Sequence, residues 1–127
     1  KVEKSQKGWG VGIHQYTIES DAPWMIPRQS RIACAVSHQD QVVVPPEGAR
    51  LLAGSDFCPN GALDYAQGPA ISFQMHPEFD HAFAAELLRA REGRIARPLI
   101  DDALASLSRG SDRALIAGWI ARFLQAP

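Results

Sequence analysis

The spacing of apolar residues changes at about two thirds of the chain, from short strand-like runs to a helical period. Up to about residue 75, alternating or apolar runs are separated by turn sequences such as Pro59-Asn60-Gly61. After Asp80, apolar residues recur three or four positions apart, as on one face of a helix. Strands followed by helices on one side normally indicate the α+β class. Strands are predicted at 9–18, 32–37, 42–44, 50–53, 62–66 and 70–75, and helices at 80–92, 98–108 and 112–125.

The run Ile32-Ala33-Cys34-Ala35-Val36 adds a second constraint, because it is apolar at every position. Such a run is typical of a strand that is buried on both faces. Few helices follow to cover it, so the chain of 127 residues is predicted to be part of a larger α/β sheet. The last predicted helix also carries an apolar stripe, which should pack against the sheet or against the helix at 98–108. That stripe includes Leu115, Trp119, Ile120 and Phe123.

Composition excludes several functional classes. Thirteen basic and fourteen acidic residues give a net charge of −1, and 46% of residues are hydrophobic. These values argue against a disordered tail and against a basic surface for nucleic acid. No apolar run approaches the roughly 20 residues that cross a membrane. Cys34 and Cys58 form neither a disulfide framework nor a CxxC zinc motif, and a reducing cytoplasm suits them both.

His76 and Glu78 are the strongest candidates for chemistry. They follow a predicted strand, and residues two apart in an extended segment project to the same side. A carboxylate beside an imidazole can accept the ring N–H and make the other ring nitrogen more basic. The spacing alone leaves two interpretations open: a base with its orienting carboxylate, or a pair that stabilises a corner of the fold. A metal site is disfavoured, because no third ligand stands at a suitable spacing.

Three stretches resemble class I glutamine amidotransferases of the triad type, whose nucleophile is a cysteine. Gly8-Trp9-Gly10-Val11-Gly12 is similar to the strand that follows the nucleophile helix in that family. Ser37-His38-Gln39-Asp40 resembles its Ser-His-x-Asp segment, and Phe73–Phe79 resembles its Phe-Gln-x-His-Pro-Glu segment. Ser55–Pro59 is similar to the amidotransferase domain of GMP synthase and to stand-alone proteins of that kind. The resemblance covers residues 8–92.

The resemblance implies a flavodoxin-like α/β fold with a mixed sheet, and an enzyme that hydrolyses the side-chain amide of L-glutamine. It implies that His76 is the general base and acid and that Glu78 orients it. Backbone around His38, Gln39, Asp40 and Gln41 would hold the α-amino and α-carboxylate groups of glutamine. For Asp40, the capping of a turn is an equally good interpretation.

The resemblance also implies the organisation of the chain and its partners. Residues 1–92 would form the C-terminal half of the amidotransferase domain, and residues 93–127 a helical extension packed on it. No cofactor and no metal are expected. Released ammonia would pass to an unknown acceptor, which a synthetase partner could carry.

The sequence departs from the family at the nucleophile. Neither cysteine lies in the Gly-x-Cys-x-Gly motif of the family, and residues 1–7 resemble the stretch that follows it. We therefore expect the nucleophile and the N-terminal half of the domain to precede Lys1. Residues 1–127 alone should then be inactive and prone to self-association through open sheet edges. The alternative is an amidotransferase-like protein without a nucleophile, which binds a ligand or supports a partner.

Overall fold

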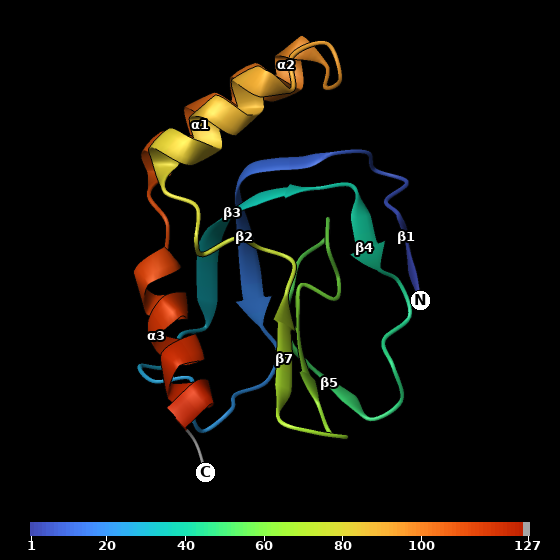
Figure 1. Ribbon diagram of the computed structural model, residues 1–127, viewed down its shortest axis with the longest axis vertical. Coiled ribbons are helices and arrows are strands. Elements are labelled where there is room, and N and C mark those ends of the chain that lie inside the picture. The colour runs from blue at the N-terminus through green and yellow to red at the C-terminus, as the bar shows by residue number, and fades with distance from the viewer. Residues whose placement is uncertain (126–127) are drawn as a thin grey trace.

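The strands and helices of the computed structural model follow the predicted order (Figure 1). The structure describes residues 1–125. Within them, the strands are β1 (Val2–Lys4), β2 (Gly10–Ile18), β3 (Arg31–His38), β4 (Asp40–Val42), β5 (Ala49–Gly54), β6 (Ala62–Tyr65) and β7 (Ala70–Phe73). The helices are α1 (His81–Ala90), α2 (Arg97–Ser106) and α3 (Arg113–Gln125), and a 3-10 turn covers Leu107–Arg109. The predicted fold class is confirmed.

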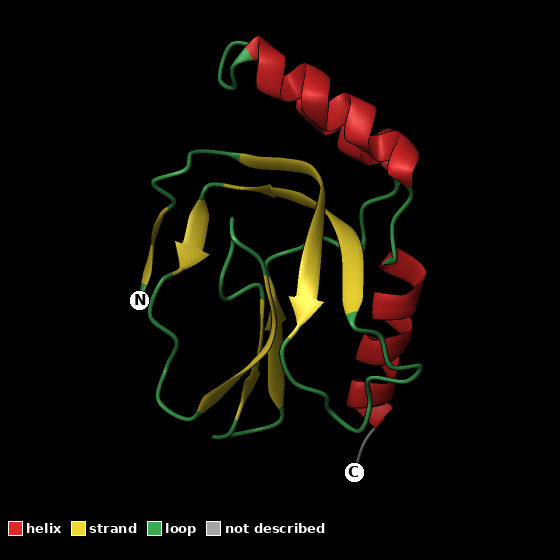
Figure 2. Cartoon of the chain, turned by 180° about the vertical axis from the view of Figure 1, so that it is seen from behind, coloured by secondary structure: helices red, strands yellow, loops and turns green. Residues whose placement is uncertain are grey.

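Five strands form one curled sheet in the order β3-β2-β5-β6-β7, and β1 and β4 form a separate ribbon (Figure 2). All pairings between these described strands are antiparallel. The segment after β7 returns to the outer edge of β3, where the His76 amide donates to the Ala35 carbonyl at 2.8 Å. This return places the end of β7 beside the strand that leads to His38.

The two-sided burial predicted for residues 32–36 is confirmed, but two different layers provide it. Cys34 and Val36 belong to a core formed with β5, β6 and α3. Ala35 points to the opposite face and packs with residues of α1 and α2. Figure 1 shows α1 and α2 across one end of the sheet and α3 along its side. The curl of the sheet thus covers one face of β3 that the predicted helices alone could not.

The strand predicted at 42–44 is wrong in position. The structure ends β4 at Val42, and Val43 and Val44 are exposed. Their amides donate to the Lys1 carbonyl, so the β-branched run continues as an irregular segment along the N-terminus. The partner of β4, β1, was not predicted because all three of its residues are exposed and Val2 is its one apolar residue.

The C-terminal helices pack on the same two cores as the strands. Trp119 and Ile116 of α3 are fully buried, and Leu115, Ile120 and Phe123 are partly buried against the core that contains β3. The predicted stripe therefore packs on the sheet. The boundary predicted between residues 92 and 93 remains a prediction. No helix within residues 1–125 is long and apolar enough to span a membrane.

Gly12 of β2 is expected to tolerate no side chain, because α2 packs directly on it. Its φ of +83° is a left-handed conformation, and an added Cβ would lie 2.9 Å from the Ala103 Cα. Left-handed strain of about 1–2 kcal/mol and overpacking of about 1–3 kcal/mol predict that Gly12→Ala lowers the free energy of unfolding by about 2–5 kcal/mol. Urea denaturation of the intact protein measures this.

Gly93 provides the matched control for Gly12. It has a similar φ of +84°, but nothing lies within 4 Å of its hypothetical Cβ. Gly93→Ala should therefore show only the conformational strain, about 1–2 kcal/mol. Equal losses for the two variants would mean that α2 moves away from Gly12 without cost.

Candidate active site

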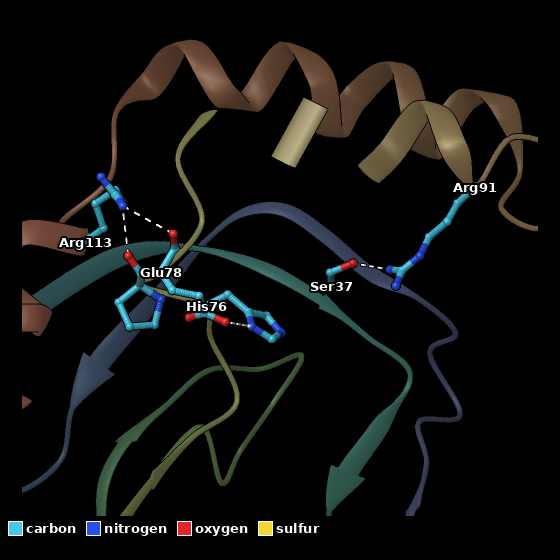
Figure 3. A network of polar contacts seen from close by, with 6 residues as sticks. Ser37, His76, Glu78, Arg91 and Arg113 are labelled. Carbon is cyan, nitrogen blue, oxygen red and sulfur yellow. Dashed lines mark hydrogen bonds and ion pairs between the residues drawn. The ribbon is translucent and has the colours of Figure 1, made fainter. Parts of the chain in front are cut away.

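His76 and Glu78 form a hydrogen-bonded pair in the turn between β7 and α1. Nδ1 of His76 lies 2.6 Å from Oε1 of Glu78 (Figure 3). The imidazole is 32% exposed and the carboxylate side chain 62% exposed. The predicted geometry of the pair is confirmed, and both groups are accessible to a molecule from solution.

Local packing holds the His76 ring in place. The ring stacks on Phe79 with a centroid distance of 4.2 Å and an interplanar angle of 4°. The Phe79 amide donates to the His76 carbonyl, and Asp80 caps α1 by accepting from the Phe83 amide. With Glu78 ionised, the hydrogen bond requires a proton on Nδ1 of His76. That tautomer leaves Nε2 as the nitrogen that can accept a proton.

His38 lies at the same end of the sheet as His76 and is partly buried. Burial, followed by the nearby imidazoles of His14 and His76, lowers the pKa of His38. Both of its ring nitrogens are buried without a hydrogen-bond partner among the described residues. Its ring lies 6.0 Å from that of Phe57, measured between centroids. The lowered pKa favours the neutral imidazole, and substrate binding by the His38 backbone stays a prediction.

The rest of the predicted binding segment runs from β3 into β4. Asp40 is exposed and pairs in register with Lys4 of β1. The Gln39 carbonyl accepts from the Ser5 amide at 2.7 Å. The Gln41 side chain is 5% exposed and donates to the Phe57 carbonyl at 3.0 Å. Gln41 thus fixes the loop that carries Phe57, and substrate binding by this segment stays a prediction.

Sequence reasoning missed two arginines, one that contacts the turn of the pair and one that contacts β3. Arg91, which caps the C-terminal end of α1, donates to the Ser37 hydroxyl and lies 4.8 Å from the centre of the Trp9 ring. Arg113 begins α3 and donates to backbone carbonyls of the turn that carries Glu78 (Figure 3). Neither belongs to a motif. One feature of the sequence could have pointed to Arg113. A cation is unfavourable in the first turn of a helix, so an arginine there suggests a contact outside the helix.

The two cysteines are not placed to react. Cys34 in β3 and Cys58 in the loop after β5 are both fully buried and unpaired. Burial raises the pKa of each thiol to about 11, so almost none is thiolate at neutral pH. Within residues 1–125, no group of three His, Cys, Asp or Glu side chains is arranged to hold a metal ion.

Relatives of the chain include glutamine-hydrolysing proteins. It is 42% identical over 91 residues to a glutamine-hydrolysing GMP synthase subunit of Archaeoglobus fulgidus, an alignment that covers 70% of this chain and 49% of that protein. It is 32% identical over 94 residues to γ-glutamyl peptidase 2 of Arabidopsis thaliana, with coverage of 69% and 36%. The chain thus spans half or less of the length of these relatives. No protein-family model matches the sequence.

Solved structures of glutamine amidotransferases have the same fold as this chain. A glutamine amidotransferase from Thermotoga maritima matches with a TM-score of 0.78 and 17% identity, over 99% of this chain and 55% of that one. A glutamine amidotransferase from Methylobacillus flagellatus matches with a TM-score of 0.73 and 16% identity, over 98% and 55%. In sequence and in fold, the chain is therefore a class I glutamine amidotransferase-like domain.

Proposed function

We propose that His76 and Glu78 are two members of a Cys-His-Glu triad that hydrolyses the side-chain amide of L-glutamine. The observation that carries this proposal is the 2.6 Å hydrogen bond between Nδ1 of His76 and Glu78. It holds the ring in the tautomer that a general base needs, with Nε2 open to a thiol proton. The names of the glutamine-hydrolysing relatives support the same reaction.

The reaction would proceed in two steps. Nε2 of His76 takes the thiol proton of the cysteine, and the thiolate attacks the side-chain carbonyl carbon of glutamine. The protonated imidazole then gives its proton to the leaving nitrogen, so that ammonia departs and a γ-glutamyl thioester remains. Water activated by His76 hydrolyses the thioester to glutamate and restores the thiol. Glu78 stabilises the imidazolium that forms in each step.

The nucleophile in this proposal is a cysteine outside residues 1–127. Cys34 and Cys58 are excluded as nucleophiles in this conformation by their burial and their high pKa. Residues 1–127 by themselves should then release no ammonia from glutamine. If the intact protein has no glutaminase activity either, the alternative applies, namely a binding or structural protein without a nucleophile.

We further propose that the ammonia is used by a synthetase on a separate chain. This partner is suggested by the Archaeoglobus fulgidus relative, which is named as one subunit of a GMP synthase. The cytoplasm suits such a partnership and the two unpaired thiols.

Replacing Glu78 tests the proposal in the intact protein. Glu78→Ala removes the carboxylate that orients His76, so we expect kcat for ammonia release from L-glutamine to fall by up to about 10⁴-fold, as when the orienting carboxylate of a triad is replaced. KM should change little, because Glu78 acts on the ring and not on the bound substrate. Initial rates over a range of glutamine concentrations separate the two constants.

Glu86 serves as the control for Glu78. It is an exposed carboxylate on α1 that pairs with Arg89. Glu86→Ala should leave both constants within error of the unmodified protein. An unchanged kcat in Glu78→Ala would contradict the proposed triad.

A further inference from the structure

Arg113 occupies a position where its charge is disfavoured by its own helix. It is the first residue of α3, and the amino end of a helix carries a partial positive charge. Its guanidinium turns away from α3, toward the turn between β7 and α1. Nε donates to the Pro77 carbonyl at 3.1 Å, and Nη2 donates to the Glu78 carbonyl at 3.3 Å (Figure 3).

These two carbonyls define the backbone on either side of Glu78. The Pro77 carbonyl belongs to the peptide plane before the Glu78 Cα, and the Glu78 carbonyl belongs to the plane after it. One rigid guanidinium that holds both planes restricts φ and ψ of Glu78 together. Since these angles set the direction of the Cα–Cβ bond, Arg113 restrains the starting direction of the Glu78 side chain.

Burial does not perform this task, because the Glu78 side chain is 62% exposed. Anchoring of α3 does not require Arg113 either. The Asp112 amide donates to the Ala33 carbonyl and the Asp112 carboxylate accepts from the Ala33 amide, both at 2.7 Å. Trp119 is fully buried in the core. The helix is therefore held on both sides of Arg113 by contacts that do not involve its guanidinium.

We propose that Arg113 is a positioning residue that keeps the Glu78 carboxylate directed at His76. The proposal rests on the proposed function, and it assigns to the C-terminal helix a part in the active site. Arg113 acts through Glu78 and touches neither the substrate nor the reacting atoms. A lysine at this position would keep the charge but lacks the planar guanidinium that donates to both carbonyls from fixed positions.

The test uses the intact protein with Arg113→Ala, Arg113→Lys and, as the control, Arg122→Ala. Arg122 lies on the same helix and, among residues 1–125, its guanidinium donates only within that helix, to the Gly118 carbonyl. We expect Arg113→Ala to lower kcat for ammonia release from L-glutamine by about 10–100-fold with KM unchanged. Arg113→Lys should lie between Arg113→Ala and the unmodified protein, and Arg122→Ala should behave as the unmodified protein.

A spectroscopic readout separates positioning from stability. In protein with ¹⁵N-labelled histidine, the proton on Nδ1 of His76 should give a low-field resonance because it is bonded to a carboxylate. That resonance should broaden or disappear in Arg113→Ala while the melting temperature stays close to that of Arg122→Ala. An unchanged resonance and kcat would overturn the proposal, as would a loss of kcat that only follows the unfolded fraction.

The same series distinguishes this proposal from the proposed function. If Glu78→Ala lowers kcat and Arg113→Ala does not, then only the positioning role of Arg113 fails. If neither substitution has an effect on an active protein, the triad itself is wrong and the role of Arg113 fails with it.

Discussion

Replacing His76 by alanine is expected to lower kcat for glutamine hydrolysis by about 10²–10⁴-fold, the range that general acid–base catalysis contributes. Both proposed steps pass a proton through Nε2 of this ring, so the variant loses the acceptor for the thiol proton and the donor for the leaving nitrogen. The measurement is the initial rate of ammonia release by the intact protein at saturating glutamine.

His81 is the matched control for His76. It is the first residue of α1, five positions along the chain, and takes no part in the hydrogen bond to Glu78. His81→Ala should keep the full rate. A protein that remains fully active after His76→Ala would show that the pair only stabilises the corner between β7 and α1, the other interpretation that the spacing allows.

Replacing Trp119 by alanine is expected to cause one of the largest losses of stability in the chain. Its side chain is fully buried in the core that contains β3, and its indole Nε1 donates to the Pro27 carbonyl at 3.1 Å. Truncation of a buried Trp typically lowers the free energy of unfolding by about 3–5 kcal/mol, since a cavity remains. Urea denaturation of the intact protein, followed by circular dichroism, measures the change.

Leu124 on the same helix is the control for Trp119. It is 74% exposed, so Leu124→Ala should change the free energy of unfolding by no more than about 0.5 kcal/mol. A comparable loss for both variants would indicate that the exposed end of α3 is covered by another surface in the intact protein.

The sequence predicted those elements whose causes are local. Asp80 marks the beginning of α1 because it caps the helix, and the apolar run at 32–36 marks β3 because both of its faces are buried. The ribbon of β1 and β4 could not be predicted in this way, since backbone hydrogen bonds hold it and its residues are mostly exposed.

The candidate site shows the same division. His76 and Glu78 are neighbours in the chain, so their spacing was enough to predict the hydrogen bond between them. Arg113 lies 36 positions after Pro77 and 35 after Glu78, whose carbonyls it contacts. The periodicity of the sequence does not predict a contact between residues so far apart. The proximity of the His38 and Phe57 rings likewise joins residues of two separate segments.

The outer edge of β3 has a consequence for how the site is assembled during folding. The Ala35 carbonyl accepts a hydrogen bond from the His76 amide. The Ala33 amide and carbonyl form hydrogen bonds with Asp112, a residue 79 positions later. Contacts across so many residues close large loops and belong to the slow part of folding. Nascent chains would therefore complete β2 and β3 well before His76 and Glu78 acquire their final geometry. Pulsed hydrogen exchange during refolding measures this order. The Ala33 amide should become protected from exchange at the same time as glutaminase activity returns.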